Sequence, residues 1–473
     1  MAVPWCSPSA PSNRAQLPTP RSGLSHKLIA APVMARRGAA SRAAHPNAAA
    51  AAAEQQPLPS RRVRATDAPC IVKTKALVAS TPGTLSLAQG IVHWAPPPQA
   101  LATAAAMAAD PAVSQYGPDE GLPALREALR RKIREENGLE GYDVMITAGA
   151  NQAFTNVVLA LLDADDRAAL FSPYYFNHYM ALQMTGGGDN VAFGPRCPGS
   201  GHPDLDWLAA ELAGPRPPKL VVITNPCNPT GVLMTQEEVE RAAALCGAAG
   251  AWLVLDNTYE HFTFGHDGDG APRRHRCVAA PHVVNIFSFS KAFGMMGWRV
   301  GYIAYPEDGS GALAAQLLKV QDTIPVCGTQ LSQYVALGAV EAGRDWVAQQ
   351  VAGLEGNRQA IIDALSPLGP GSVLGGEGAI YFFARLPEGC EDDEAVVRWL
   401  VRKHKVCLIP GTSCGRPGHV RAAFANLKPE VCAEAAARLK AGLQELVGEG
   451  MPAVHAFLQQ DSRQAAPAAV ASR

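Results

Sequence analysis

Five short apolar runs alternate with longer helical patterns between residues 68 and 450, and this alternation constrains the fold more than any other feature. The runs span residues 144–146, 168–171, 220–224, 252–256 and 283–287. Between residues 122 and 133, by contrast, apolar side chains recur at helical spacing. Such alternation predicts βαβ crossovers, and therefore an α/β fold with a mostly parallel sheet.

Charge and cysteine usage exclude several classes of protein. The 473 residues include 41 Lys and Arg and 42 Asp and Glu, a net charge of −1, which argues against nucleic acid or a membrane surface as a partner. No run approaches the roughly 20 apolar residues that span a bilayer. The 11 cysteines are scattered and form no C-x-x-C pair, so we expect free or buried thiols and no metal site.

The two ends of the chain differ in composition from its middle. The first acidic residue is Glu54, and the basic residues before it lie among Ala, Ser and Pro, as in organellar transit peptides. We predict a disordered leader over residues 1–66 that directs the chain to an organelle, a chloroplast in preference to a mitochondrion. An Ala-rich extension without a targeting role, and hence a cytoplasmic protein, is the alternative. Residues 451–473 are predicted to form a tail.

Ligands of parallel sheets bind at the carboxyl ends of the strands, so the residues after each run are candidates for the site. Small residues at 147–153 open a helix, whose N-terminus suits a phosphate. Two Asn-Pro steps within residues 225–231 predict a stiff turn that fixes an amide side chain. Asp256 ends the fourth run, where an acid is costly unless it is paired, although a helix cap would also explain it.

The fifth run leads into a lysine with apolar surroundings. Residues 288–294 read Ser-Phe-Ser-Lys-Ala-Phe-Gly, and Arg299 follows. Where water is scarce, the ammonium form of Lys291 is disfavoured, so its pKa falls and its amine becomes a nucleophile towards carbonyls. Arg299 is always charged and suits a phosphate. A solvated surface lysine is the alternative, but the phenylalanines on both sides argue against it.

The segment 288–301 resembles the pyridoxal-phosphate attachment signature of the class I/II aminotransferases. Hydroxyl residues stand three and one positions before the lysine, and an arginine stands eight positions after it. The resemblance extends from about residue 86 to residue 446. Within the family, three stretches are most similar to the plant aromatic aminotransferases, which favour methionine as amino donor. These stretches are residues 114–122, 173–177 and 375–381.

This resemblance implies a domain organisation. The family has the fold type I architecture, a large domain with a mostly parallel central sheet and a smaller α/β domain. By this likeness, residues 113–330 form the large cofactor-binding domain and residues 331–450 the small domain. Residues 67–112 form an N-terminal arm and part of the small domain.

The resemblance also implies a catalytic set. Lys291 would bind the cofactor, pyridoxal 5′-phosphate, covalently and then move a proton on the substrate. Asp256 would pair with the pyridine nitrogen. Tyr259 and Asn228 would hydrogen-bond the phenolic oxygen of the cofactor, and Tyr175 would stack on the ring.

The phosphate group of the cofactor has an implied set of its own. The resemblance implies that four residues hold it, namely Ala150, Asn151, Ser288 and Arg299, and that Ser290 lies close by. A tyrosine at the position of Tyr116 reaches the phosphate of the neighbouring subunit. The resemblance therefore implies a homodimer with shared active sites.

Substrate recognition is implied at the C-terminal end. Arg421 matches the arginine that grips the substrate α-carboxylate, and Gly90 and Asn228 lie near the same group. Trp94 and Tyr175 are predicted to be apolar walls, which suit an aromatic or thioether side chain.

The implied activity is a transamination. The enzyme would move an amino group between an aromatic amino acid such as tryptophan, or methionine, and a 2-oxo acid, by a ping-pong mechanism through pyridoxamine phosphate. A C–S or β-lyase using the same cofactor, and an aminotransferase of the kynurenine or aspartate type, are the alternatives.

Three patterns are interpreted as coincidences. Residues 411–415 fit the G-x-S-x-G string of serine hydrolases, but Pro417 favours a loop over a nucleophile elbow. Residues 288–291 fit S-x-x-K, but no partner motif of penicillin-binding enzymes appears. Three histidines are not at metal-ligand spacing and are predicted to lie in solvent, namely His261, His266 and His275.

Overall fold

The computed structural model describes residues 57–266, 268, 270–307 and 309–465. Most of the predicted leader, and with it the predicted targeting signal, lies outside the described residues. Its last ten residues are described and include the short helix α2 (Arg61–Ala65). The residues from Pro59 onwards form one compact unit.

A seven-stranded sheet lies at the centre of this unit. In spatial order its strands are β2 (Tyr142–Thr147), β8 (Gly301–Pro306), β7 (Val283–Ser288), β6 (Trp252–Asp256), β5 (Leu220–Thr224), β3 (Ala168–Phe171) and β4 (Val191–Gly194). From β7 to β4 all neighbours are parallel, whereas β8 runs antiparallel to both β2 and β7. All five predicted apolar runs are therefore strands, and the predicted mostly parallel α/β sheet is confirmed.

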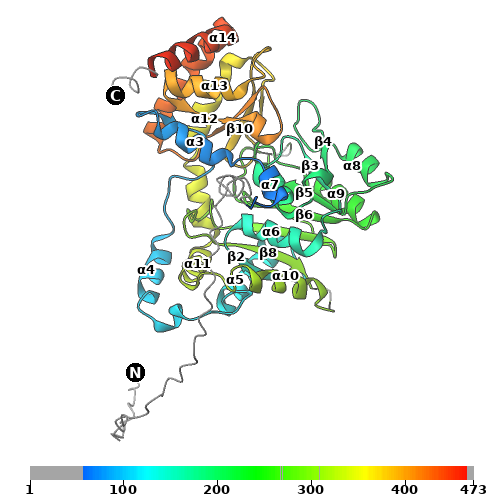
Figure 1. Cartoon of the computed structure of the whole chain (residues 1–473). Helices are drawn as coiled ribbons and strands as arrows, with labels where there is room; N and C mark the ends of the chain where they lie inside the picture. The colour runs from blue at the N-terminus through cyan, green and yellow to red at the C-terminus, as the bar shows by residue number, and fades with distance from the viewer. Residues whose placement is uncertain (1–56, 267, 269, 308, 466–473) are drawn as a thin grey trace, which may run out of the picture. The chain divides into compact units, whose positions relative to one another are not determined.

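Helices cover both faces of the sheet (Figure 1). One apolar layer contains α6 (Ala150–Leu161), α7 (Phe176–Thr185) and α10 (Ala312–Thr323), and the opposite layer contains α8 (Leu205–Leu212) and α9 (Gln236–Ala248). Alternate strand residues face the two layers, as Val222 and Val221 do. The strands are thus buried on both sides, which is why they read as continuous apolar runs.

The predicted helix near residue 122 is α5 (Pro123–Asn137). Pro123 occupies its first turn, where the missing N–H costs nothing, and Gly138 ends it in the left-handed conformation with φ of 70°. Leu125, Leu129 and Ile133 are fully buried, so the helical spacing in the sequence marks the face that packs on the core.

A second, antiparallel sheet lies in the C-terminal part. Its strands are, in order, β12 (Ile409–Pro410), β13 (His419–Ala423), β10 (Tyr381–Arg385) and β9 (Val373–Leu374), and it is accompanied by α12 (Glu355–Leu365), α13 (Asp393–Trp399) and α14 (Pro429–Ala465). β1 (Leu85–Ser86) pairs in parallel with β11 (Val406–Cys407). An N-terminal segment is therefore hydrogen-bonded into the C-terminal part of the chain.

The remaining elements connect these parts. They are α3 (Cys70–Ala79), α4 (Pro98–Met107), η1 (Pro111–Ser114), η2 (Gly188–Asn190), α11 (Gln330–Ala352), η3 (Ser366–Leu368), η4 (Leu400–His404) and η5 (Gly411–Cys414). The long α11 kinks at Gly343 and joins the two sheets. Residues 411–414 form a short 3₁₀ turn, so the G-x-S-x-G string is not a nucleophile elbow.

The C-terminal end differs from the sequence-based expectation. Residues 451–465, which were predicted to belong to a tail, continue α14 after a kink at Gly450. Val454 is fully buried, and Met451 and Leu458 pack against the core one turn before and after it. This helical spacing of apolar residues was overlooked in the sequence. Residues 466–473 lie outside the described part.

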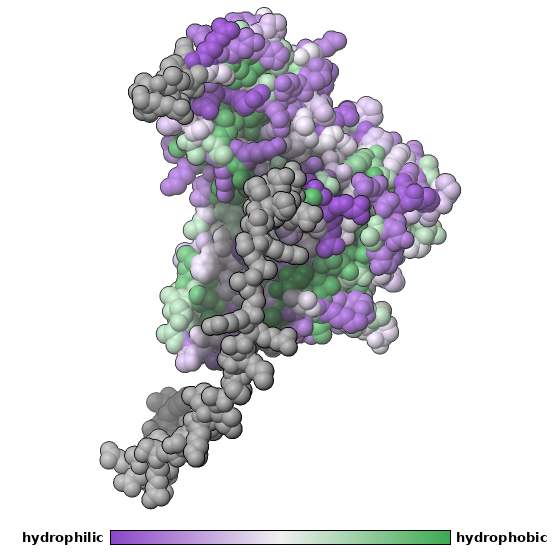
Figure 2. All heavy atoms as spheres, viewed as in Figure 1, coloured by the Kyte–Doolittle hydropathy of each residue, from purple (hydrophilic) through white to green (hydrophobic). Residues whose placement is uncertain are grey.

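The surface and the cysteines fit the composition. Figure 2 shows hydrophilic and hydrophobic residues interspersed on the visible face, with hydrophilic ones prevailing over the C-terminal helices at the top. None of the helices within the described residues is long and apolar enough to cross a bilayer. The ten described cysteines are all free thiols, as predicted.

Candidate active site

A cavity of about 250 Å³ lies where β5, β6 and β7 end. Its walls contain twelve of the thirteen residues predicted to act in catalysis or to bind the cofactor or the substrate carboxylate, namely Gly90, Ala150, Asn151, Tyr175, Asn228, Asp256, Tyr259, Ser288, Ser290, Lys291, Arg299 and Arg421. The thirteenth, Tyr116, does not line the cavity, and 84% of it is exposed. The carboxyl ends of parallel strands thus converge on one site, as the topology requires.

Asp256 is the last residue of β6 and is 4% exposed. Its Oδ2 lies 3.0 Å from Nε2 of His178 on α7, and its Oδ1 accepts a hydrogen bond of 3.0 Å from the Thr258 N–H. Burial opposes ionisation, but these hydrogen bonds and the His178 charge prevail and lower the pKa of Asp256. The cavity therefore contains a buried, ionised carboxylate.

Lys291 follows β7 and is partly buried in the cavity wall. Burial, with the positive charges of Arg299 and Arg421, lowers its pKa to about 8, although Asp256 acts in the opposite direction. A substantial fraction of the amine is thus neutral near physiological pH. Neutral amines attack carbonyl carbon, so this lysine has the chemistry expected from its apolar neighbours in sequence.

The N-terminus of α6 forms a cradle for an anion. Gly149, with φ of 83°, precedes the helix, and no side chain caps it. A Cβ at Gly149 would overlap Nη2 of Arg299, and one at Gly301 would lie 2.7 Å from the Ala150 nitrogen. The Nη2 donates a hydrogen bond of 3.1 Å to the Ala148 carbonyl. Gly149 therefore lets a guanidinium lie directly against a helix N-terminus, which suits a phosphate, and Gly301 lets β8 approach the same N-terminus closely.

Arg421, on β13, is 1% exposed. Its Nη1 donates to Asn228 Oδ1 and its Nη2 to the Ala88 carbonyl, each at 2.8 Å. The guanidinium lies 4.3 Å from the centre of the Tyr381 ring, and its Nε has no hydrogen-bond partner. A buried donor without a partner is costly, so an anion that approached Arg421 would be bound favourably.

Tyrosines complete the cavity. The hydroxyls of Tyr259 and Tyr381 share a short hydrogen bond, and burial raises the pKa of Tyr259 well above its usual value. The Tyr175 hydroxyl accepts a hydrogen bond from Asn177 and donates one to Asn151. These phenols are neutral and act as hydrogen-bond donors and acceptors rather than as charges.

Sequence reasoning missed several lining or supporting residues. Tyr381 ends the stretch 375–381, which resembles the family but gave no sign of the role of this tyrosine. His178 lies one helical turn after Tyr175, and this spacing could have identified it. Nothing in the sequence points to Ile71 and Lys75, which reach the cavity from α3, far away along the chain.

Two predictions about individual side chains are wrong. Trp94 is not among the residues that line the cavity; it packs on Phe262 and donates a hydrogen bond of 3.2 Å to the Ala292 carbonyl. His261 and His275 are partly buried instead of solvated, and only His266 is exposed. Burial lowers the pKa of both His261 and His275 to about 4, so these two partly buried histidines are neutral beside Glu260.

Comparisons with known proteins agree with this site. A family model described as aminotransferase class I and II matches residues 82–439. The aromatic aminotransferase ISS1 of Arabidopsis thaliana is 49% identical over 393 residues, which are 83% of this chain and 98% of the relative. The aspartate/prephenate aminotransferase of Thermus thermophilus is 31% identical over 333 residues, 70% of this chain and 83% of that relative.

A solved structure shares the fold. The aspartate aminotransferase from Thermus thermophilus with maleate superposes with a TM-score of 0.71 at 27% identity, over 82% of this chain and 100% of that chain. The family match spans most of the chain, and residues matched to the family's motifs meet in one cavity. The chain therefore belongs to the class I and II aminotransferases, which use pyridoxal phosphate to move amino groups between amino acids and 2-oxo acids.

Proposed function

We propose that this aminotransferase acts on aromatic amino acids such as tryptophan and on methionine as amino donors. The relative with 49% identity is named an aromatic aminotransferase, which supports this choice. Apolar and aromatic side chains also line the cavity, among them Ile71, Ile91 and Phe176. The observation that carries the chemistry is the amine of Lys291, whose pKa is lowered in a cavity that also contains Asp256 and Arg421.

The residues present fit pyridoxal phosphate. Arg299 and the uncapped N-terminus of α6, with Ser288 and Ser290, would hold its phosphate, because only glycine fits at residue 149 beside that guanidinium. Asp256, being ionised, would hold the pyridine nitrogen. When bound, the cofactor supplies an aldehyde for amines and a ring that delocalises the electron pair left at the substrate Cα.

The side chains of this chain then have distinct tasks. Lys291, with a pKa near 8, takes and returns the proton at the substrate Cα close to neutral pH. Asp256 keeps a proton on the ring nitrogen. Tyr259 and Asn228 donate hydrogen bonds to the phenolic oxygen, and Arg421, fixed by Asn228 and the Ala88 carbonyl, binds the α-carboxylate beside Gly90.

A panel of amino donors tests the proposed specificity. We expect Trp, Phe, Tyr and Met to give higher kcat/KM than Asp or Ala. All donors share the α-amino and α-carboxylate groups that transamination needs, so the preference comes from apolar contacts between the cavity and the substrate side chain. Lys291→Ala is the control and should be inactive with every donor. A clear preference for Asp would contradict the aromatic assignment and favour an aspartate-type enzyme, the second candidate, which the name of the Thermus relative supports.

We infer that the enzyme is a homodimer in which Tyr116 reaches the phosphate in the neighbouring subunit. Tyr116 is 84% exposed, and Ile324 and Val326 are large exposed apolar residues as well. The segment that contains Tyr116 and the one that contains Ile324 and Val326 are linked, because Gln330 donates a hydrogen bond of 3.1 Å to the Ala112 carbonyl. Exposed apolar residues of this kind favour a contact with another chain.

The domain boundaries and the destination of the protein stay proposals. We propose domain divisions at residues 113 and 331, and a small domain that extends to residue 465 so that it includes the helical residues 451–465. We also propose that residues 1–66 direct the protein to a chloroplast. A fluorescent protein fused behind these residues should accumulate in chloroplasts, and a diffuse cytoplasmic signal would contradict this.

A further inference from the structure

A second cavity, of about 530 Å³, lies beside the segment that carries Asp256 and Tyr259. Its walls come from the C-terminal end of α5, from residues 260–275 and from the C-terminal half of α11. It shares no lining residue with the active-site cavity. Its volume lies in the range of sites that bind small molecules.

One side of the second cavity is apolar. Phe264, Val347 and Val351 line it, and each is at least nine-tenths buried. The two valines lie one turn apart on α11 after its kink at Gly343, so they present one continuous face. This side therefore suits the apolar body of a ligand.

The glutamates in the wall already have cationic partners. Glu260 lies 2.8 Å from the Lys132 ammonium, and although burial opposes its ionisation, Lys132 prevails and lowers the pKa of Glu260 to about 2. Glu136 lies 3.8 Å from the same ammonium, and Glu355 pairs with Arg358 at 2.8 Å. These acids thus leave little negative charge for a cation to bind.

The arginines in the wall are less fully engaged. Arg273, Arg274 and Arg344 line the cavity, and neither Arg274 nor Arg344 has a hydrogen bond or ion pair with another described residue. If Lys132 and Arg358 are counted with the lining, positive charges outnumber negative ones by two among the described residues. The cavity therefore attracts anions.

The second cavity adjoins residues that the proposed function assigns to the cofactor. Glu260, in its wall, directly follows Tyr259. His275, also in its wall, has its Nε2 2.9 Å from Oδ1 of Asn257, the residue after Asp256. A ligand that displaced Glu260 or His275 would thus be felt at the active site.

We propose that the second cavity binds a small organic anion, with a carboxylate or phosphate on an apolar body, and that this ligand modulates transamination. The anionic group pairs with Arg274 and Arg344, and the apolar body packs on Phe264 and Val347. The effect reaches the active site through Glu260 and His275. This inference does not depend on which amino donor the enzyme prefers.

Calorimetric titration of the holoenzyme with three probes tests the site. Phenyl phosphate and phenylacetate carry the same apolar body with different anionic groups, and inorganic phosphate has no apolar body. Each titration is repeated in Arg421→Ala, where the proposed active-site partner of a carboxylate is absent. Arg344→Met and Arg274→Met remove the charges of the second cavity. Arg131→Met is the matched control, because Arg131 is exposed on α5 but does not line the cavity.

We expect one equivalent of phenyl phosphate or phenylacetate to bind per chain in Arg421→Ala, more tightly than inorganic phosphate. Arg344→Met and Arg274→Met should each raise the dissociation constant about tenfold to a hundredfold, as for the loss of one hydrogen bond to a charged group. Arg131→Met should not change it. Binding of one aromatic probe alone would support the site and identify its ligand as a phosphate ester or a carboxylate.

The effect on the reaction is measured with wild type at saturating probe. We expect kcat/KM for transamination to change on the order of fivefold, and to stay constant in Arg344→Met, which should have normal activity without the probe. Absence of binding by both aromatic probes, wild-type affinity in Arg344→Met, or binding that is lost in Arg421→Ala would overturn the site. Binding that leaves kcat/KM unchanged would overturn the modulation.

Discussion

At the scale of single residues, Lys291 shows how surroundings change the chemistry of a side chain. Burial and two nearby guanidinium groups disfavour its ammonium form, and Asp256 only partly compensates. The resulting pKa of about 8 allows the amine to hold or release a proton near neutral pH. A surface lysine without these neighbours would stay protonated.

This lowered pKa can be measured on the cofactor-free protein. Acetylation of Lys291 by acetic anhydride, followed by peptide mass spectrometry, should reach half its maximal rate near pH 8, because only the neutral amine reacts. Asp256→Asn should lower the midpoint further, since it removes the one charge that favours the ammonium. A reactivity that still rises above pH 10 would contradict the assignment.

Residues near strand ends could be predicted from the sequence, but their partners could not. Asp256 and Lys291 follow apolar runs, so the topology alone brings them together. Tyr381 comes from the second sheet and Lys75 from an N-terminal helix, and no local pattern specifies how those parts fold over the first sheet. The partly buried His261 and His275 were misjudged because polarity alone was taken as a sign of exposure.

At the scale of elements, the approach of Arg299 to α6 depends on Gly149. We expect Gly149→Ala to weaken binding of pyridoxal phosphate at least tenfold, because the new Cβ would displace the guanidinium from the helix N-terminus. Spectroscopic titration of the cofactor-free protein measures this. The control is Gly138→Ala, which also has positive φ but open space around it, and which should strain the backbone by about 1 kcal/mol without changing affinity. If wild type and Gly149→Ala bound pyridoxal phosphate with equal affinity, the assignment of the phosphate to Arg299 and the N-terminus of α6 would be wrong.

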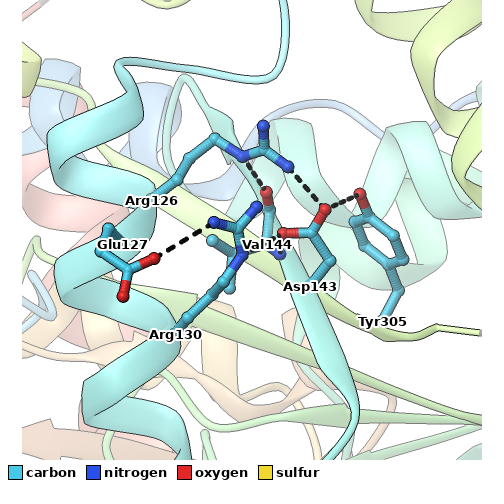
Figure 3. A network of polar contacts seen from close by, with 6 residues as sticks. All are labelled: Arg126, Glu127, Arg130, Asp143, Val144 and Tyr305. Carbon is cyan, nitrogen blue, oxygen red and sulfur yellow. Dashed lines mark hydrogen bonds and ion pairs between the residues drawn. The ribbon is translucent and has the colours of Figure 1, made fainter.

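An ion network fastens α5 to the edge strand β2 (Figure 3). Asp143 of β2 accepts hydrogen bonds from Arg126 at 2.5 Å and Arg130 at 2.7 Å, and Tyr305 of β8 donates to it at 3.2 Å. Burial raises the pKa of Asp143, but the two arginines and the Val144 N–H outweigh it and lower the value below 3.8. The ionised carboxylate thus stabilises the fold.

We expect Asp143→Asn to lower the free energy of unfolding by about 1.5–3 kcal/mol at pH 7, the range for hydrogen bonds to a charged group. Because the folded-state pKa is depressed, this stabilisation is complete above the unfolded value of 3.8 and is lost as the pH falls through the lower folded value. Denaturant unfolding at several pH values measures it. Glu127→Gln is the control. The Glu127 side chain is 70% exposed in its ion pair with Arg130, so its loss should change the free energy of unfolding by less than about 0.5 kcal/mol. A pH-independent difference for Asp143→Asn would argue against an electrostatic origin.

At the scale of the whole molecule, the sequence predicted the central sheet better than its surroundings. Five of the seven strands of this sheet were predicted, because burial on both faces leaves an apolar signature in the sequence. The strand β1 has only two residues and is held by pairing with β11, more than 300 residues later, so no local signal could reveal it. The continuation of α14 beyond residue 450 was missed because its composition is Ala- and Gln-rich.

The proposed homodimer gives a role to Tyr116. We expect sedimentation to report twice the protomer mass, and Tyr116→Phe to raise the dissociation constant of pyridoxal phosphate about tenfold to a hundredfold, as for the loss of one hydrogen bond to a charged group. The variant should remain dimeric, since only the hydroxyl is removed. A monomeric wild-type enzyme that binds the cofactor tightly would contradict the shared site.

Product stoichiometry in the presence of one amino acid alone tests the amino-group transfer most directly. If Lys291 and its neighbours perform transamination, the holoenzyme should convert one equivalent of tryptophan or methionine per chain into the 2-oxo acid and then stop. Addition of a different 2-oxo acid should restart turnover. Continuous release of ammonia and a 2-oxo acid without any acceptor would show a lyase instead and would contradict the assigned reaction.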